Sequence, residues 1–471
     1  MECDQSDGLV EINKLLRDGM IMKKLAHFRL FDTLSKKMVA GFIVLILIGT
    51  VLLSLPWATP ANVHTSLIDV LFTSASATCI TGLTVVNTAA HWTTFGQLVI
   101  LVLSEVGALG YMTFAVLLFN IMRRQIGLST QLMVKASLNL ERLSDTKSVM
   151  KYVVGLSLLF QLGGFGLLAV DFVPRFGWRH GLYVSLYHAV MSFCNAGFDV
   201  FGDSLQGFRD DPYVLTVTMV LIIAGGLGFL VWRDVLLYHT RKRLTLNSKL
   251  TLLTTFSLFV IGFVLLLITE RDLALLPNGM SWVNRTINTL FLSVTPRTAG
   301  LITMPTQGLQ AGSLLVIMIL MFVGGTPGST AGGIKTTTFG VLMFQSIAQL
   351  RGRRDVEFSH RRFSQENINR ALMLIFLASI VLTVATLILT QTEKIPKGFG
   401  LEYVLFEVLS AFGTVGLSLG LTPNLTLIGK IVIMMLMFIG RVGIFTSLYA
   451  LSRRQARVNL IRYPAENILI G

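Results

Sequence analysis

One short pattern occurs four times along the chain, each time between two long apolar runs. Every copy has a small or β-branched residue, then a glycine, then leucine or phenylalanine. The glycines of the four copies are Gly82, Gly197, Gly300 and Gly416. A leucine followed by an aromatic residue precedes each glycine by about the length of one short helix. Self-similarity of this kind indicates a chain built from four similar units.

The apolar runs decide the class of protein. Of the 471 residues, 53% are hydrophobic and only 14% are charged, which is typical of a protein with several membrane spans and not of a soluble domain. A spanning helix needs about 20 apolar residues. Runs of suitable length lie at 38–56, 97–120, 152–173, 214–238, 249–269, 313–347, 371–390 and 427–451.

Four mixed stretches, each just before one of the glycines, are too short and too polar to span a membrane. They lie at 65–77, 182–194, 283–295 and 400–412, and we interpret them as re-entrant pore helices. The expected fold is therefore an all-α integral membrane protein with four pseudo-symmetric membrane-helix–pore-loop–membrane-helix repeats and eight spanning helices. The repeats are expected at 38–121, 149–240, 247–349 and 369–452, between a cytoplasmic N-terminal segment at 1–37 and a cytoplasmic C-terminal tail at 453–471.

The distribution of charge predicts the topology. The net charge is +14, and the basic residues gather in the connectors that lack the glycine pattern. They include Lys36, Lys37, Arg123, Arg124, Lys135, Arg241, Lys242, Arg243, Arg351, Arg353, Arg361, Arg362, Arg453 and Arg454. Because Lys and Arg accumulate in cytoplasmic loops, we expect both termini inside and all four glycine segments entering from outside. The positive charge then reflects topology, and no nucleic-acid partner is expected.

A second glycine motif recurs with the same fourfold spacing. Every apolar run that follows a glycine segment contains Gly-x-x-Gly. The pairs are Gly107 and Gly110, Gly225 and Gly228, Gly325 and Gly328, and Gly440 and Gly443. Glycine alone is weak evidence, since membrane helices use it for close packing, but two fourfold patterns at a nearly constant offset support the repeat.

The repeated glycines predict an ion filter. Backbone at membrane depth must satisfy its own polar groups unless it lines a watery cavity, and glycine allows the torsions that turn carbonyls toward an axis. A ring of carbonyls can replace the hydration shell of a monovalent cation, and pore helices point their negative ends at it. The predicted filter residues are Ile80, Thr81, Gly82, Asn195, Ala196, Gly197, Thr298, Ala299, Gly300, Thr414, Val415 and Gly416. The alternative interpretation is that the four glycines mark ordinary tight turns.

The whole chain resembles the Trk/Ktr/HKT superfamily of potassium transporters, above all the Ktr membrane subunit (KtrB type). The four filter glycines, eight spans and the ending from Arg462 to Gly471 carry the resemblance. It implies potassium uptake by a multi-pass protein of the bacterial plasma membrane, with K⁺ in the filter. Gly82, where sodium-preferring plant relatives have serine, implies potassium.

The resemblance also implies partners. These are a second copy of the subunit in a homodimer, membrane lipid, and a cytoplasmic nucleotide-binding regulatory ring (KtrA type). ATP or ADP would bind the ring, so no cofactor is expected on this chain, and activation by sodium is a further implication. An ion-coupled potassium symporter (sodium or proton) of Trk type is the alternative function. An enzyme is not expected, because the sequence contains no recognisable catalytic motif and no metal-ligand spacing.

The sixth apolar run is interrupted, and we interpret the interruption as a gate. It consists of Gly324, Gly325, Thr326, Pro327, Gly328, Ser329, Thr330, Ala331, Gly332, Gly333, Ile334 and Lys335. A helix does not run through a proline among so many glycines, so a helix broken at mid-membrane is expected. In relatives a loop at this place is the proposed gate. The run is not a phosphate-binding loop, because Ile334 separates Gly333 from Lys335.

Three charged residues and two cysteines within the apolar runs or beside the filter remain. Arg441 is expected either in the pore, where it holds the gate loop and repels cations, or neutralised by the carbonyls of a neighbouring helix. Glu105 is expected as a hydrogen-bonded packing partner or as an ion ligand. Arg297 could brace the third filter strand through backbone carbonyls. Cys79 and Cys194 are expected to be buried thiols behind the filter.

Overall fold

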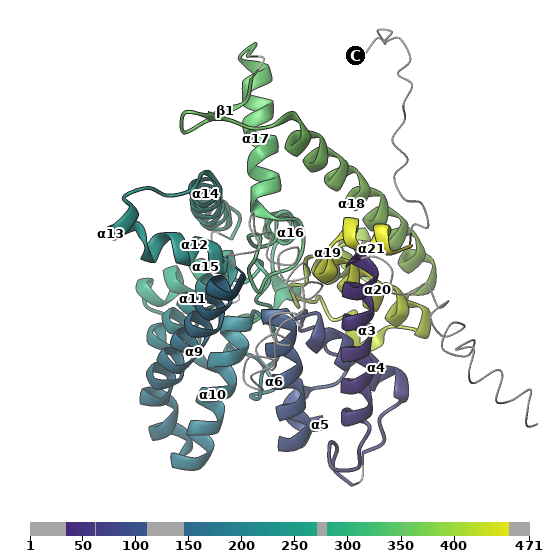
Figure 1. The fold of residues 1–471 in the computed structure, drawn as a ribbon. Coiled ribbons are helices and arrows are strands. Elements are labelled where there is room, and N and C mark those ends of the chain that lie inside the picture. Colours follow the sequence, from purple (N-terminus) through teal and green to yellow (C-terminus); the bar gives the residue numbers. More distant parts are fainter. Residues whose placement is uncertain (1–33, 62, 111–145, 271–279, 354, 452–471) are drawn as a thin grey trace, which may run out of the picture.

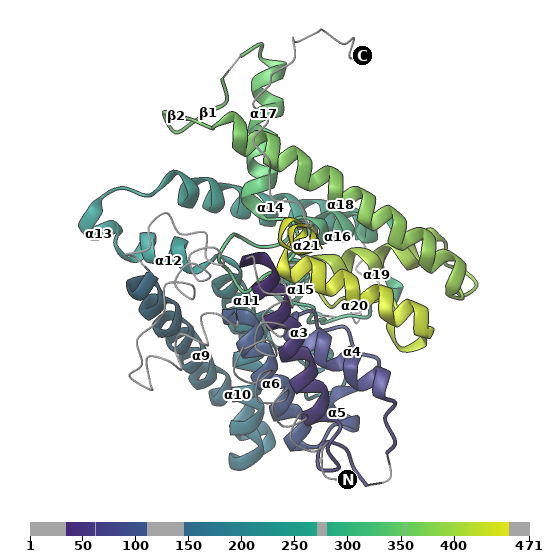
Figure 2. The ribbon, with the colours of Figure 1, turned by 45° about the vertical axis from the view of Figure 1, so that its right-hand side comes forward.

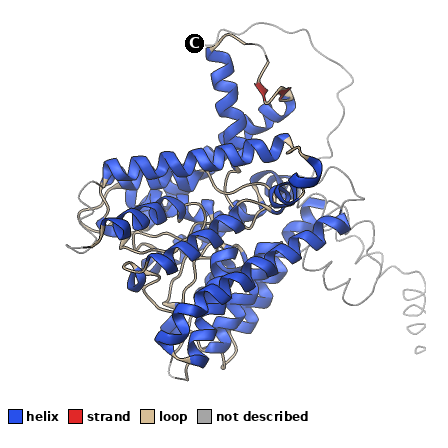
Figure 3. Ribbon diagram, turned by 90° about the vertical axis from the view of Figure 1, so that its left-hand side faces the viewer, coloured by secondary structure: helices blue, strands red, loops and turns tan. Residues whose placement is uncertain are grey.

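The computed structural model describes residues 34–61, 63–110, 146–270, 280–353 and 355–451. This part of the chain is mainly helical, and its one sheet is a hairpin of β1 (Glu357–Phe358) and β2 (Arg361–Arg362). Figure 3 shows the helices with loops running between them through the middle of the molecule. Residues 1–33 of the predicted N-terminal segment 1–37, the predicted tail 453–471 and the basic residues of 123–142 lie outside the described residues.

Four units follow one another along the chain. The first contains α3 (Leu34–Leu53), α4 (Leu67–Thr78), α5 (Thr88–His91) and α6 (Thr94–Leu109). The second contains α9 (Thr146–Phe176), α10 (Trp178–Cys194), η3 (Gln206–Phe208), α11 (Pro212–Gly226), α12 (Phe229–Leu236) and α13 (Tyr238–Arg241). The third contains α14 (Leu246–Thr269), α15 (Trp282–Val294), η4 (Thr306–Gly308), α16 (Ala311–Phe322), α17 (Thr336–Leu350) and the hairpin. The fourth contains α18 (Gln365–Thr392), α19 (Leu401–Gly413), η5 (Thr422–Asn424), α20 (Leu427–Val442) and α21 (Ile444–Leu451). Figure 1 labels these elements.

Polar caps define where many of these helices begin. The side chains of Ser66, Thr93 and Thr426 accept hydrogen bonds from backbone N–H groups in the first turns of α4, α6 and α20. Asp211 caps α11 in the same way, and Pro212 occupies the first position of that helix. Such caps satisfy donors that have no partner inside the helix.

The first helix of each unit is a membrane span by length and composition. α3, α9, α14 and α18 pass this test. Each presents large apolar side chains outward: Val51, Val170, Phe256 and Phe376 are 63%, 68%, 69% and 66% exposed. The described residues thus contain four candidate spans, or six if each of two bent helix pairs counts as one. The protein is a multi-pass membrane protein, because lipid is the solvent that such helix surfaces require.

Two predicted spans are not straight. The run 214–238 was expected as one helix, but α11 and α12 meet at 98° beside Gly228. The run 427–451 was also expected as one helix, but α20 and α21 meet at 105° beside Gly443. Both glycines have a positive φ, which ends a right-handed helix.

The four mixed stretches all form helices, α4, α10, α15 and α19, and their C-terminal halves are buried. By contrast, α17 and the hairpin project from the rest of the helices (Figure 2). The aromatic rings of Phe344, Phe358 and Phe363 pack together there, with centroids 4.8–6.5 Å apart. The long loop region between α16 and α17 contains no helix, as predicted from Pro327 and its glycines.

Candidate functional site

The four repeated glycines lie side by side in a closed ring. A methyl group placed on Gly82 would lie 2.7 Å from the Cα of Gly197, and one on Gly197 would lie 3.1 Å from the Cα of Gly82. One on Gly300 would lie 3.1 Å from the Cα of Gly416 and 3.3 Å from that of Gly197. One on Gly416 would lie 3.3 Å from the Cα of Gly82. Only glycine permits backbones to approach this closely.

The backbone of each ring segment is left-handed at two positions. The glycines have φ values of 79°, 70°, 69° and 93°, and the residues two places earlier also have positive φ. Those residues are Ile80, Asn195, Thr298 and Thr414, at 58°, 58°, 75° and 51°. Three of them are β-branched, and such residues rarely adopt a positive φ. Conformations of this kind persist where the surroundings enforce them, and they cluster at functional sites.

A short helix points its C-terminus at each ring segment. In the first, second and fourth units the residue before the ring glycine donates to the carbonyl five residues earlier, at 2.8, 3.0 and 2.8 Å. The third unit differs, because the Ala299 N–H donates to the Thr295 carbonyl at 3.0 Å. The negative helix ends and the turned carbonyls make this centre suitable for a cation. Whether these residues select ions stays a prediction.

The Gly-x-x-Gly motifs serve two separate purposes. A methyl group on Gly107, Gly225 or Gly440 would collide with a carbonyl oxygen of the chain just before the ring, on Thr78, Phe193 or Phe412 respectively. The first glycine therefore allows the following helix to contact the end of the short helix. The second glycine has positive φ in all four units: Gly110, Gly228, Gly328 and Gly443, at 76°, 83°, 69° and 95°. Gly110, Gly228 and Gly443 lie at helix ends, whereas Gly328 lies inside the loop 324–335.

The loop 324–335 contacts three of the four units. Its backbone N–H groups donate to the carbonyls of Gly226 (from Thr326, 3.2 Å) and Gly440 (from Gly333, 3.2 Å). Its Gly328 carbonyl accepts from Phe229 at 2.9 Å. The loop also lies against the ring, since a methyl group on Gly332 would meet the side chain of Thr414. The loop thus joins the ring to the points where α11 and α20 end.

Arg441 contacts both the loop 324–335 and the backbone carbonyls of a neighbouring helix, the two kinds of partner considered from the sequence. Its guanidinium donates to the Thr330 carbonyl in the loop, and also to the carbonyls of Gly107 (2.5 Å) and Ala108 (3.0 Å) in α6. Lys335 donates to the Ala331 carbonyl at 2.7 Å within the same loop. None of the ion pairs found among the described residues includes either cation.

The remaining predicted residues are placed as follows. Glu105 accepts from Gln161 at 2.7 Å and from the Cys194 thiol at 2.9 Å, as a packing partner would. Cys79 and Cys194 are buried free thiols. Arg297 donates to the Gly324 carbonyl at 3.1 Å, so its described side-chain bond reaches the loop and not the filter strand that it was expected to brace.

The carboxylate of Asp199 is bonded within its own loop, just after the second ring segment. One carboxylate oxygen accepts backbone N–H groups of Phe201, Gly202 and Ser204, at 3.0, 2.5 and 3.2 Å. Burial raises the pKa of Asp199 above its ordinary value, although these three bonds oppose the shift.

One buried carboxyl was missed in the sequence. Glu407 of α19 is 0% exposed and accepts hydrogen bonds from Ser418, at 2.8 Å, and from Thr422. It therefore fastens the chain that leaves the fourth ring segment. The available signal was an acidic residue directly after the leucine–phenylalanine pair, and only the fold places Ser418 and Thr422 against it.

Contacts between neighbouring units surround the ring. At least one contact joins each pair of neighbours, and these contacts include Asn87 Nδ2 to the Gly202 carbonyl (2.9 Å), Leu205 N–H to the Ile302 carbonyl (2.9 Å), Gln307 Nε2 to the Leu419 carbonyl (2.9 Å), and Lys430 Nζ to Asp69 (2.6 Å). The last contact joins the fourth unit to the first and closes the circle. Among the described residues, no group of His, Cys, Asp and Glu is suited to hold a metal ion.

Comparison with known families identifies this arrangement. The family model for TrkH, described as a cation transport protein, matches residues 17–459. The chain belongs to the TrkH family of cation transport proteins. The family is one of membrane transporters and not of enzymes, as expected from the sequence.

Several curated relatives match nearly the whole chain. The potassium/sodium uptake protein NtpJ of Enterococcus hirae is 47% identical over 96% of this chain and 100% of its own length. The Ktr system potassium uptake protein B of Bacillus subtilis is 38% identical over 92% of this chain and 95% of its own. The Vibrio alginolyticus protein of the same name is 34% identical, with coverage of 92% and 93%. The resemblance to the Ktr group is therefore confirmed.

A solved structure shares the fold. The crystal structure of the potassium transporter TrkH from Vibrio parahaemolyticus superimposes with a TM-score of 0.67, at 20% identity. The match covers 91% of this chain and 86% of that one.

Proposed function

We propose that the chain takes up potassium ions across a bacterial plasma membrane through a filter lined by backbone carbonyl oxygens. The observation that carries the proposal is the closed ring of Gly82, Gly197, Gly300 and Gly416, with its left-handed backbone. Carbonyls around one axis substitute for the water shell of a monovalent cation. The names of the relatives, which are potassium or potassium/sodium uptake proteins, support the choice of ion.

The loop 324–335 is the proposed gate, and Arg441 is its latch. Arg441 connects the loop to the end of α6, and its charge lies among carbonyls close to the ring. A cation that leaves the ring would meet this charge as a barrier. Withdrawal of the loop would break the bond to Thr330 and remove the obstruction.

The architecture that we propose has eight spans in four repeats, with both termini in the cytoplasm. The helices following the ring then count as spans, despite the bends at Gly228 and Gly443 and the loop between α16 and α17. A homodimer, a nucleotide-binding cytoplasmic ring and activation by sodium belong to the same proposal. The exposed arginines Arg353, Arg361 and Arg362 near the projecting hairpin offer a surface to an acidic partner.

Ion-coupled symport is the second candidate, and the name "potassium/sodium uptake protein" of one relative favours it. The two candidates differ in whether potassium flux needs a second ion gradient. In liposomes that contain the purified chain, the reversal potential of a channel-like pore follows the potassium gradient alone. A coupled symporter instead shifts its reversal potential when a sodium or proton gradient is added.

The test of the main proposal combines growth with selectivity. Expression of the chain, together with a regulatory ring, should restore growth of an uptake-deficient bacterium at low potassium. Gly82→Ser should lower the potassium-to-sodium permeability ratio about 10-fold or more, because a side chain at this position collides with the backbone of the neighbouring ring segment. A 10-fold change corresponds to about 1.4 kcal/mol. Gly163→Ser is the matched control, because Gly163 of α9 has no atom near its Cβ position. An unchanged ratio in Gly82→Ser would refute the filter.

A further inference from the structure

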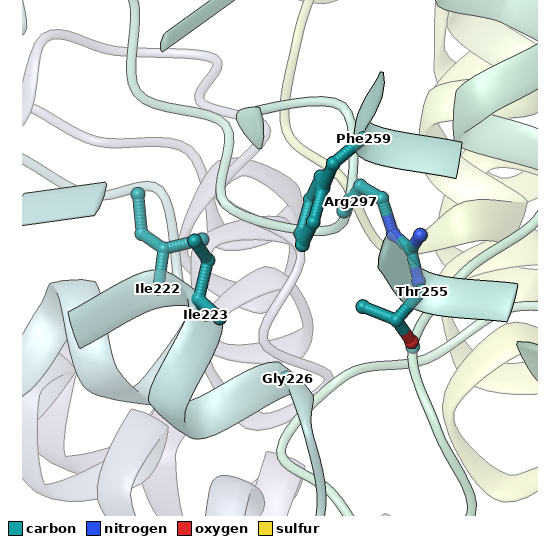
Figure 4. A pocket seen from close by; sticks show the side chains of 7 residues that line it. Ile222, Ile223, Gly226, Thr255, Phe259 and Arg297 are labelled. Carbon is teal, nitrogen blue, oxygen red and sulfur yellow. The ribbon is translucent and has the colours of Figure 1, made fainter. Parts of the chain in front are cut away.

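Arg297 connects the filter to the gate within the third unit. It directly precedes the filter residue Thr298, and it is 4% exposed. Its Nη2 donates to the carbonyl of Gly324, the first residue of the gate loop, at 3.1 Å. The guanidinium also lies beside the Phe259 ring of α14 (Figure 4). Its carbon is 5.0 Å from the centre of that ring.

The guanidinium is held by few contacts for a buried charge. No ion pair found among the described residues includes Arg297, and its Nη1 has no hydrogen-bond partner. A buried charge normally requires full pairing. Phe259 supplies a cation–π contact, which compensates only in part.

A small pocket lies beside this spare donor. It is lined by Thr255, Phe259 and Arg297, by Ile222, Ile223 and Gly226 of α11, and by Gly325 of the gate loop. The hydroxyl of Thr255 is buried and also has no partner. The structure shows the guanidinium bonded to the loop. If the loop moved away, the Thr255 hydroxyl would be the acceptor for a second arrangement of this side chain.

In the third unit the chain between the short helix and the ring glycine is longer than in the second and fourth units. The helix α15 ends at Val294, six residues before Gly300, whereas α10 and α19 end three residues before their ring glycines. In the third strand the backbone bond to the helix end is displaced, since the Ala299 N–H donates to the carbonyl of Thr295, the residue just after α15. Arg297 lies in this longer connection, where a shift of its side chain is transmitted directly to Thr298.

We propose that Arg297 is a positioning residue that couples the third filter strand to the gate loop, so that the position of the loop alters ion selectivity. The inference rests on the proposed function. With the loop in place, Arg297 is pulled toward Gly324 and holds Thr298 in its left-handed conformation. With the loop released, Arg297 turns toward Thr255, and the third strand relaxes.

The test compares the effect of releasing the loop with and without Arg297. The full chain is purified, reconstituted in liposomes, and measured for potassium-to-sodium permeability ratio. Arg441→Ala releases the loop and should change the ratio by about 3- to 30-fold, the range for single residues in a coupled network. In an Arg297→Gln background the same change should alter the ratio less than about 2-fold. Equal changes in both backgrounds, or no change in either, overturn the coupling.

Controls separate this outcome from simpler failures. Arg285→Gln changes an arginine of α15, the helix that leads to Arg297, and should leave the effect of Arg441→Ala intact. Gly82→Ser reports on the filter itself: if it fails to alter the ratio, the proposed function fails and not the coupling alone. If Arg297→Gln does not fold, Phe259→Leu is used in its place, because it removes the ring that contacts Arg297. In this background the effect of Arg441→Ala on the permeability ratio should be at least 2-fold smaller. An effect of unreduced size would refute the coupling.

Discussion

Several residues at the ring have unfavourable backbone torsions, and Arg441 beside the loop 324–335 places a positive charge inside the protein. Ile80, Thr298 and Thr414 are β-branched and left-handed, although glycine would fit these torsions at less cost. Arg441 places a cation against three carbonyls, with no carboxylate among its described partners. Both choices destabilise the fold locally, which is consistent with selection for binding and control.

Arg441→Ala should raise the basal potassium flux. The substitution removes three charge-assisted hydrogen bonds that join the loop to α6. A hydrogen bond to a charged group contributes about 1.5–3 kcal/mol. If the closed state loses even one such bond, the rate of potassium flux should rise roughly 10-fold. Liposome flux assays at equal protein amount measure this change. Arg243→Ala, on an exposed connector residue, serves as the control and should keep the parental rate.

Unchanged kinetics in Arg441→Ala would contradict the latch. A reduced flux with a lower melting temperature would instead indicate that Arg441 mainly holds α6 and α20 together.

At the scale of elements, the helix after the ring makes a close contact in three units. The first glycine of the motif lies against the end of the short helix in the first, second and fourth units. In the second and fourth units the second glycine marks a bend in the described chain, whereas the third unit has the loop 324–335 at the corresponding place.

Sequence patterns could predict the positions of these elements but not their bends. The ring glycines repeat with flanking apolar runs, so the pattern alone predicts four similar segments. The bends at Gly228 and Gly443 were not expected, because Gly-x-x-Gly is equally typical of straight helices in close contact. The partners of Arg297 and Glu407 were also not predictable, since Gly324, Ser418 and Thr422 reach them only through tertiary packing.

The two glycines of one motif should differ in their tolerance of alanine. Gly440→Ala would place a methyl group on the Phe412 carbonyl, so α20 must move away from the ring, at a cost of about 1–3 kcal/mol or more. Gly443→Ala meets only Thr446, at 3.9 Å, and costs the positive-φ backbone conformation alone, about 1–3 kcal/mol. Melting of the purified protein should rank Gly440→Ala as the less stable variant, and the reverse order would contradict this division of roles.

At the scale of the whole molecule, the ring exists only because four units of one chain close on themselves. Three junctions between units are hydrogen bonds to backbone carbonyls, made by Asn87, Leu205 and Gln307. The fourth junction joins segments that are 361 residues apart, through Asp69 of α4 and Lys430 of α20. It is also the only one of these junctions made by an ion pair.

The pair between Asp69 and Lys430 should therefore affect selectivity as well as stability. The side chains are 20% and 16% exposed, so Lys430→Met leaves a largely buried carboxylate without its partner. We expect a loss of about 1.5–3 kcal/mol in unfolding free energy and a several-fold lower potassium-to-sodium permeability ratio, since α4 ends at the ring. Arg370→Met removes a 66% exposed charge from an ion pair within α18 whose carboxylate, on Glu366, is 71% exposed, and should cost about 0–1 kcal/mol with no change in the ratio.

A charge reversal separates closure of the ring from loss of a single charge. Asp69→Lys combined with Lys430→Asp restores the attraction with opposite polarity, so it should recover part of both the stability and the selectivity. The single reversal Asp69→Lys instead faces Lys430 with a like charge and should be the worst variant. If the double variant is as unselective as Lys430→Met, the junction does not shape the ring, and the four glycines are held in place by the packing of the short helices alone.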